Sequence, residues 1–297
     1  MGKIASMKQS LDHALGKGKA TNNGNSRVAG REQYYTPTET SLRLTRQAVA
    51  LIPHYRGKTF IEPAAGTGSF VKAFGAMGIE SIIALDIEPK FEGVLQTDFL
   101  EYKLPKGLSN AVAISNPPFG RNHSLSIPFF NKLAPHCSHI GFVVPRSWRK
   151  WSIVNRLDKH FHLILDEDVN VDYVDGNGGQ VYPRGGGLKT IFQLWERREG
   201  LRPKVDVVDR KLIERTRPDL ADISLTVFGR GCGTFKREFP RVKNTTQMFL
   251  KVLDPIAYKA LEHANLEQFY SNVAFVEALS WDEINYALNE YLDSPKA

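Results

Sequence analysis

Six short apolar segments, separated by stretches of helical or turn character, constrain the fold of this chain more than any other feature. They lie at residues 59–63, 81–87, 111–115, 139–145, 162–166 and 189–195. None shows a clear alternation of apolar and polar side chains, which is typical of parallel strands buried on both faces of a sheet. Strands that alternate with helices favour an α/β fold. We therefore predict a doubly wound, mainly parallel sheet over residues 32–199.

The two ends of the chain differ from this central part. Residues 1–31 contain six Lys and Arg and one acidic residue without apolar periodicity, which indicates a flexible basic arm or an inert solubilising tail. Residues 200–297 combine short β-like runs with a C-terminal helical pattern, in which Ser280 and Glu283 have the spacing of a capping box. We predict three parts, with a small α+β region as the third.

The composition limits the class of protein. A chain of 297 residues with 42% hydrophobic and 24% charged residues is typical of soluble globular proteins. No apolar run approaches the roughly 18 residues of a membrane span. Cys137 and Cys232 lie far apart and have no metal-ligand spacing, so we expect a reducing cytoplasm and no metal site. We also expect a monomer without a membrane partner. The formal charge of +7 favours a polyanionic partner, although charge alone does not identify nucleic acid.

The first segment that indicates chemistry is FIEPAAGTGSF, residues 60–70, where a strand meets a small-residue turn and a helix begins at Ser69. Gly66 and Gly68 allow a ligand to lie against the backbone. Asp86 follows Gly66 by twenty residues and ends the next strand, where a carboxylate can accept hydrogen bonds from ribose hydroxyls. The full dinucleotide motif is missing, which favours a single nucleoside. The alternative is an ordinary strand-to-helix turn.

A second segment, Thr97-Asp98-Phe99, has two interpretations. The carboxylate of Asp98 could accept from an adenine amino group while the ring of Phe99 covers the base. Without further context, a helix cap together with core packing is the better interpretation of an Asp-Phe pair at the end of a strand.

The third segment is AISNPPFG, residues 113–120, in which two prolines end an apolar strand. The side-chain oxygen of Asn116 and the carbonyl oxygen of Pro117 could both accept hydrogens of an exocyclic aromatic amine. Such acceptors would draw the amine toward a tetrahedral nitrogen whose lone pair attacks an electrophile. Phe119 could stack on the base and fix the angle of approach. The alternative, a rigid turn with a core phenylalanine, fits NPP alone but explains less once a nucleoside-binding turn precedes it.

The segments EPAAGTGSF, LDIEP, TDF and NPPFG, in this order, resemble the S-adenosylmethionine-dependent N6-adenine methyltransferases. The cofactor motif precedes the tetrapeptide, which is similar to the γ-type arrangement of that family. Residues 33–37, QYYTP, resemble the family's segment that closes over the methionine end of the cofactor. The resemblance covers about residues 32–199 and implies a Rossmann-like methyltransferase fold with S-adenosylmethionine as its cofactor.

The resemblance also implies roles for individual residues. The implied cofactor-binding residues are Thr36 and Pro37 at the methionine moiety, Glu62, Ala64 and Gly66 in the amino-acid pocket, Asp86 at the ribose, and Asp98 and Phe99 at the adenine. The implied catalytic clamp consists of Asn116, Pro117, Pro118 and Phe119. Tyr182 is our candidate for a second ring that stacks on the target base, and Tyr173 is the alternative. The glycine-rich loop after Tyr182 also fits a hairpin loop without a ligand.

Basic residues near these segments are candidates for contacts with a nucleic-acid backbone. They are Arg121, Arg146, Arg149, Lys150 and the segment 201–243, which has eleven Lys and Arg against six acidic residues. Trp148 and Trp151 are interleaved with this charge. They either stack on bases or form the core face of a helix, and the second interpretation is favoured.

Together these observations predict a site-specific DNA N6-adenine methyltransferase that binds nucleic acid, with duplex DNA favoured over RNA. Methyl transfer would be a direct displacement on an extruded base, and residues 200–297 would recognise the target. One alternative is methylation of RNA adenine or of a protein glutamine. Another is a non-catalytic protein that retains the cofactor pocket and occupies DNA, which the intact Asn116 and Asp86 argue against.

Overall fold

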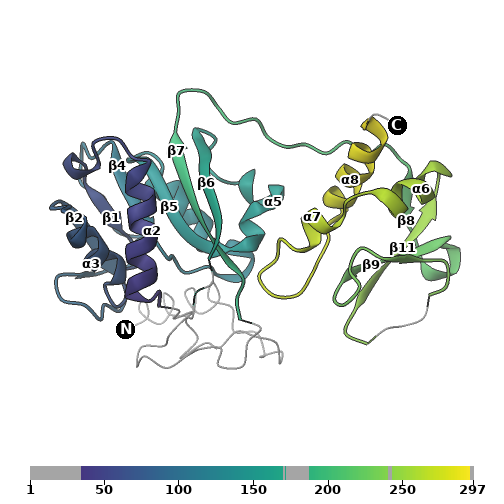
Figure 1. Ribbon diagram of the computed structural model, residues 1–297, viewed down its shortest axis with the longest axis horizontal. Coiled ribbons are helices and arrows are strands. Elements are labelled where there is room, and N and C mark those ends of the chain that lie inside the picture. Colours follow the sequence, from purple (N-terminus) through teal and green to yellow (C-terminus); the bar gives the residue numbers. More distant parts are fainter. Residues whose placement is uncertain (1–34, 170, 172–186, 240–242, 295–297) are drawn as a thin grey trace, which may run out of the picture. The chain divides into compact units, whose positions relative to one another are not determined.

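The computed structural model describes residues 35–169, 171, 187–239 and 243–294. It divides into two compact units (Figure 1). The first contains the described residues up to Pro145 together with Asn155–Pro203, and the second contains Arg146–Val154 and the chain from Lys204 onward. The predicted arm at residues 1–31, and both Tyr173 and Tyr182, lie outside the described residues. Within those residues, no helix has the length and apolarity needed to cross a bilayer.

The first unit is built on a seven-stranded sheet. Its strands are β1 (Phe60–Glu62), β2 (Ile82–Asp86), β3 (Leu95–Gln96), β4 (Ala111–Ser115), β5 (Cys137–Pro145), β6 (Phe161–Val169) and β7 (Thr190–Arg197). They have the order β3-β2-β1-β4-β5-β7-β6, and all neighbours pair in parallel except β7, which is antiparallel to both β5 and β6. The predicted fold class, a doubly wound and mainly parallel sheet of the Rossmann-like methyltransferase type, is confirmed.

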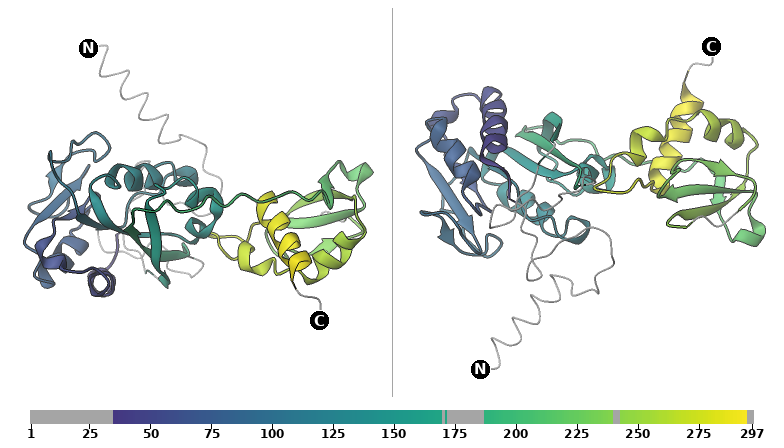
Figure 2. Two further views of the ribbon diagram at one scale, coloured as in Figure 1. Left: turned by 90° about the horizontal axis from the view of Figure 1, so that it is seen from above. Right: turned by 60° about the horizontal axis from the view of Figure 1, so that its bottom comes forward.

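Helices cover both faces of this sheet. Helices α2 (Thr38–Ala50) and α3 (Ser69–Ala76) lie side by side on one face, where Leu44, Phe74 and Phe192 belong to one buried cluster (Figures 1 and 2). Helix α4 (Ser126–Leu133) covers the other face, and the ring of its Phe130 lies 6.0 Å from that of Trp195. Apolar side chains on both faces of the sheet explain why its strands lack alternation.

The second unit combines a four-stranded antiparallel sheet with helices. The sheet has the order β10-β9-β11-β8 and consists of β8 (Ile213–Arg215), β9 (Ile223–Phe228), β10 (Phe235–Lys236) and β11 (Thr246–Val252). The helices are α5 (Trp151–Val154), α6 (Ile256–His263), α7 (Glu267–Tyr270) and α8 (Trp281–Asp293). The predicted capping box at the start of α8 is confirmed, with Glu283 N donating to Ser280 Oγ and Ser280 N donating to Glu283 Oε2.

Residues 146–154 follow β5 directly in sequence but pack with the second unit. The sequence analysis placed them within residues 32–199, the predicted catalytic domain, whereas their contacts group them with the second unit. Trp148 is completely buried. The ring centroid of Trp151 lies 5.2 Å from that of Phe269 and 4.5 Å from that of Tyr286. The core interpretation of these two tryptophans therefore describes the structure better than base stacking.

Lys150 takes part in the same packing. Its ammonium donates to the carboxylate of Glu283 at 2.9 Å and to the carbonyl oxygen of Ala278 at 3.2 Å, and both charged side chains are largely shielded from solvent. A lysine held in this way is not available to a phosphate. The structure thus removes Lys150 from the predicted backbone contacts and gives it a structural role.

Candidate active site

The order of the sheet locates a binding crevice before any side chain is considered. From β1 the chain proceeds outward through β2 to β3, and it then returns to the other side of β1 with β4. Ligands of open α/β sheets bind at the carboxyl ends of the strands where the order reverses in this way. Strand β1 ends at Glu62 and β4 ends at Ser115. The turn at residues 63–68 and the segment 116–119 therefore meet at this edge.

Glu62 links the ends of these two strands. Its Oε1 accepts a hydrogen bond of 2.5 Å from Ser115 Oγ and one of 3.1 Å from Ala64 N. The side chain is 1% exposed. Burial, opposed in part by the hydrogen bonds from Ser115 and Ala64 and aided slightly by the charge of Asp86, raises the pKa of the Glu62 carboxyl from 4.5 to about 8. At neutral pH the carboxyl is therefore mostly protonated, and it would ionise beside a bound cation.

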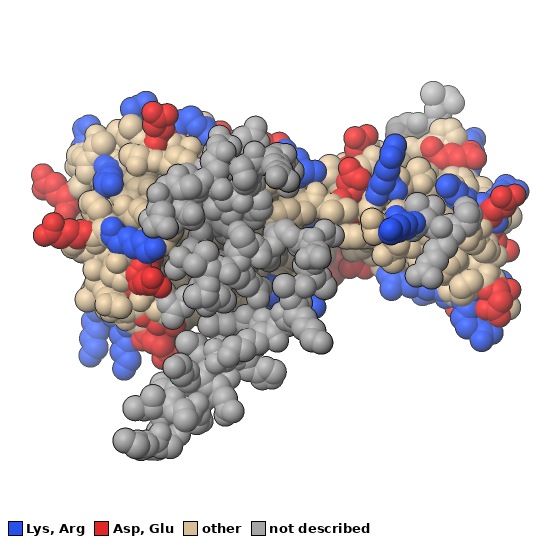
Figure 3. Space-filling view, turned by 90° about the horizontal axis from the view of Figure 1, so that it is seen from below, with Lys and Arg blue, Asp and Glu red and all other residues tan. Residues whose placement is uncertain are grey.

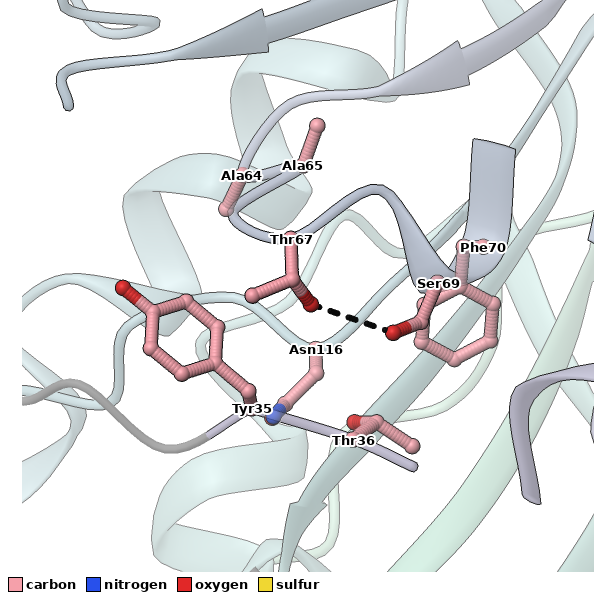
Figure 4. Close-up of a pocket in the computed structure, with 8 residues that line it drawn as sticks. All are labelled: Tyr35, Thr36, Ala64, Ala65, Thr67, Ser69, Phe70 and Asn116. Carbon is pink, nitrogen blue, oxygen red and sulfur yellow. Dashed lines mark hydrogen bonds between the residues drawn. The ribbon is translucent and has the colours of Figure 1, made fainter. Parts of the chain in front are cut away.

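A pocket lies directly above this carboxyl-terminal edge. It is lined by Tyr35, Thr36, Ala64, Ala65, Thr67, Ser69, Phe70 and Asn116 (Figure 4). The predicted residues Thr36, Ala64 and Asn116 are thereby brought together, although they come from three different parts of the chain. Figure 4 shows the turn from Ala64 to Thr67 across the pocket from the other two. The pocket thus joins the predicted cofactor turn with the first residue of the predicted clamp.

Thr36 supplies a polar atom to this pocket. The residue is buried, and within the described part of the chain its Oγ1 has no hydrogen-bond partner. Buried hydroxyls normally have a partner, so this one fits a site that receives a polar ligand. Sequence reasoning assigned no role to Tyr35, Thr67, Ser69 and Phe70, although all four belong to the two motif segments around them. Thr67 and Ser69 share a hydrogen bond of 3.2 Å between their hydroxyls.

Asp86 ends β2 and holds the glycine turn. Its Oδ2 accepts from Gly66 N and its Oδ1 accepts from Glu88 N, both at 2.7 Å. An ionised carboxylate offers about four acceptor positions, so two remain for hydroxyl groups. The predicted ribose role is compatible with this second role, in which Asp86 orients the turn.

The two glycines of the turn carry positive φ angles, +47° at Gly66 and +76° at Gly68. A Cβ atom on Gly66 would lie 2.6 Å from the ring of Tyr35, and one on Gly68 would lie 2.3 Å from the ring of Phe91. The sequence analysis expected these glycines to let a ligand lie against the backbone. In this structure the rings of Tyr35 and Phe91 already occupy the space that a Cβ atom would need.

Asp98 and Phe99 occupy local structural positions. Asp98 Oδ1 accepts from Leu100 N at 2.8 Å, as a cap does. The ring of Phe99 is buried against Phe129, with ring centroids 4.8 Å apart, and the ammonium of Lys132 lies 5.3 Å from its centre. These contacts match the cap-and-core interpretation, and an adenine contact by either residue remains a prediction.

The predicted clamp is a tightly held turn. The carbonyl oxygen of Phe119 accepts from Leu125 N at 3.3 Å and from Ser126 N at 3.4 Å, which ties the clamp to the start of α4. Gly120 has a φ of +68°, and a Cβ there would lie 2.5 Å from Ser124 Oγ. The Phe119 side chain is 6% exposed. These hydrogen bonds hold the end of the clamp near the start of α4, whereas stacking of Phe119 on a base requires its ring to become accessible.

Charged side chains of both signs are interspersed on the described surface visible in Figure 3. In the part of that face formed by described residues, neither sign of charge makes up one broad patch. Contacts with a polyanion would then depend on local groups of cations rather than on the overall charge.

No protein-family model matches this chain. Among solved structures, it is similar to a protein proposed to be an RNA methyltransferase from Pyrococcus horikoshii, with 19% identity over 64% of this chain and 97% of that one, and a TM-score of 0.45. It is also similar to a proposed class I S-adenosylmethionine-dependent methyltransferase from Listeria monocytogenes (16% identity, 68% and 71% of the two chains, TM-score 0.41).

A third similar structure is the modification subunit of a proposed type I restriction enzyme from Vibrio vulnificus (13% identity, 98% of this chain and 65% of that one, TM-score 0.41). These identities and TM-scores are low.

Proposed function

We propose that this protein is an S-adenosylmethionine-dependent methyltransferase that modifies the N6 amino group of adenine in DNA. One observation carries the proposal: Asn116, at the end of β4, lines the same pocket as Thr36 and as the turn after β1. A methyl donor held by that turn and an amine held by Asn116 would share one pocket, at the edge where α/β sheets bind ligands.

The residues around the pocket have the chemistry that the cofactor needs. The buried carboxyl of Glu62 can become the counter-ion of an α-ammonium group, and the hydroxyl of Thr36 can bond to a carboxylate. Asp86 retains acceptor positions for ribose hydroxyls. Ile87, which follows Asp86, is an exposed apolar side chain against which a base could pack. S-adenosylmethionine supplies a methyl group that its bond to a sulfonium makes electrophilic.

The clamp acts on the acceptor. The lone pair of an adenine amino group is delocalised into the ring, which makes the nitrogen a poor nucleophile. The side-chain oxygen of Asn116 and the carbonyl oxygen of Pro117 would accept its two hydrogens and localise the lone pair. The nitrogen then forms its bond to the methyl carbon as the carbon–sulfur bond breaks, and one N–H proton leaves for solvent. The ring of Phe119 would hold the base at the required angle.

Nucleic acid is the substrate class that this chemistry and the charge of +7 favour, and we propose duplex DNA over RNA. The second unit, including residues 146–154, would recognise the target. Cys137 and Cys232 are both buried and form no disulfide, which fits the reducing cytoplasm proposed for this protein. We further propose that it acts as a monomer.

Transfer of a radiolabelled methyl group to duplex DNA, structured RNA and protein, assayed side by side, tests the proposal. Label in duplex DNA is the expected result. Label in RNA or protein alone would replace the substrate by one of the alternatives. Cofactor binding without transfer to any of the three would contradict an enzymatic function.

A further inference from the structure

The hairpin formed by β9 and β10 presents an aromatic ring to solvent. Phe228, the last residue of β9, is 41% exposed. It pairs with Ala278 in an isolated antiparallel bridge, and Val276, two residues before Ala278, is 40% exposed. Single exposed apolar residues need no explanation, but two on neighbouring segments form a small apolar surface. We define the hairpin as residues 228–237.

The tip of the hairpin is held in place rather than loose. Gly229 N donates to Glu277 O at 3.0 Å, and Thr234 Oγ1 donates to Gly231 O at 2.6 Å. Gly229 has a φ of +89°, and a Cβ there would lie 2.5 Å from the carbonyl oxygen of Asn244. A rigid surface loses little conformational entropy when a partner binds to it. Phe228 is thus presented in a fixed position.

The hairpin is basic. Residues 228–237 contain three Lys and Arg and no acidic residue, so their net charge is +3. Arg230 and Lys236 are exposed, and neither forms an ion pair with an acidic side chain in the described part of the chain. The guanidinium of Arg237 lies 4.8 Å from the ring centre of Tyr258.

The basic residues that precede β9 are engaged within the protein. Ion pairs join Lys204 to Asp206, Arg210 to Asp293, Lys211 to Asp209 and Arg217 to Asp219. The fifth basic residue of this stretch, Arg215, lies over the ring of Trp281. Arg230 and Lys236 therefore differ from the cations of the neighbouring segment, because in the described part of the chain neither has an ion-pair partner and both remain available to an external anion.

We propose that the hairpin is a nucleic-acid contact in which Phe228 stacks on a base while Arg230 and Lys236 neutralise phosphates. An exposed aromatic ring on the same hairpin as two exposed cations matches the two parts of a nucleotide, its base and its phosphate. The inference rests on the proposed function and specifies which part of the second unit touches the substrate.

Fluorescence anisotropy with labelled duplex DNA, without cofactor and across a salt series, tests this inference. We expect Phe228→Ala to weaken binding about 5- to 150-fold with an unchanged salt slope, as the loss of one stacked base does, and Phe228→Tyr to restore binding. Arg230→Ala should lower the salt slope by about one. The matched controls are Leu220→Ala, an exposed apolar residue outside the hairpin, and Lys211→Ala, an ion-paired cation, and both should bind like the parent.

The readout separates the hairpin from the enzymatic proposal. If the parent binds nucleic acid and the hairpin variants weaken binding as expected, but no methyl group is transferred, the hairpin proposal is supported and the proposed function is contradicted. The parent could instead transfer methyl groups while the folded hairpin variants bind duplex DNA, single-stranded DNA and RNA as the parent does. That result overturns the hairpin proposal and points to a protein partner at this surface. No binding of any nucleic acid by the parent overturns both.

Discussion

Replacing Glu62 by Gln should change how the stability of the protein depends on pH. The carboxyl of Glu62 is buried between the ends of β1 and β4, and burial raises its pKa from 4.5 to about 8. Between these two values the folded protein keeps a proton that the unfolded chain has lost. The contribution of Glu62 to stability is therefore fully present below pH 4.5 and is lost as the pH rises through about 8. Glutamine has the same shape and stays neutral throughout.

The size of the effect follows from the shift. One pKa unit corresponds to about 1.4 kcal/mol, so keeping this carboxyl buried lowers the free energy of unfolding by roughly 3 kcal/mol at pH 7 compared with acid pH. Since glutamine retains an oxygen that can accept from Ser115 and Ala64, the variant should match the parent at acid pH. At neutral pH the free energy of unfolding of the variant should then exceed that of the parent by roughly 3 kcal/mol.

Urea unfolding followed by circular dichroism at matched pH values measures this difference. Glu92→Gln, at an exposed glutamate of the first unit, is the matched control and should parallel the parent. A Glu62→Gln variant whose stability stays parallel to that of the parent from acid to alkaline pH would refute the reasoning. So would a variant that is less stable at neutral pH.

The same residue links cofactor binding to proton release. An ammonium group beside Glu62 favours the ionised carboxylate, so binding of S-adenosylmethionine at neutral pH should release a proton from the parent. Calorimetry in two buffers with different heats of ionisation should give different binding enthalpies for the parent and equal ones for Glu62→Gln. Equal enthalpies for the parent would contradict the role proposed for Glu62.

Further substitutions test other parts of the structure. Asp86→Ala should weaken cofactor binding about tenfold or more, because charge-assisted bonds are worth about 1.5–3 kcal/mol each; calorimetric affinity equal to the parent's would contradict this. Gly68→Ala should lower stability by about 1–3 kcal/mol, since its φ is positive and the ring of Phe91 fills the space; an unchanged melting temperature would count against the ring contact. Lys150→Met should destabilise the second unit by about 3–5 kcal/mol because Glu283 stays buried without its partner. Adding Glu283→Leu should recover part of that loss, and a Lys150→Met variant as stable as the parent would disprove the structural role.

The fold could be predicted because the residues of each strand indicate by themselves that the strand is buried. Ala111–Ser115 is apolar up to its last residue, and the second strand, Thr190–Arg197, carries apolar neighbours at 191–192 and at 194–195. Adjacent strand residues point to opposite faces, so both patterns indicate a sheet covered on both faces. The antiparallel direction of the second of these strands could not be predicted, since the same side chains would be buried in either direction. No local sequence pattern could assign residues 146–154 to the second unit either. Lys150 finds its carboxylate 133 residues later in the chain.

The site could be predicted in part. The turn after β1 and the segment NPPF were recognisable from local chemistry, and the reversal of strand order brings them together at one edge. Contacts between distant residues could not be predicted, such as the ring of Phe91 against Gly68. The burial of Phe99 against Phe129 shows the same limit, because an Asp-Phe pair has the same sequence whether it caps a turn or faces a ligand.

Identification of the methylated atom tests the central claim most directly. Duplex DNA treated with the protein and with S-adenosylmethionine carrying a deuterated methyl group would be digested to nucleosides and analysed by mass spectrometry against standards. We predict labelled N6-methyldeoxyadenosine from the parent and from Asn289→Ala, a partly exposed control in the second unit, and none from Asn116→Ala, which should still bind the cofactor. A label on a ring nitrogen or on another base, or full activity of Asn116→Ala, would contradict the account.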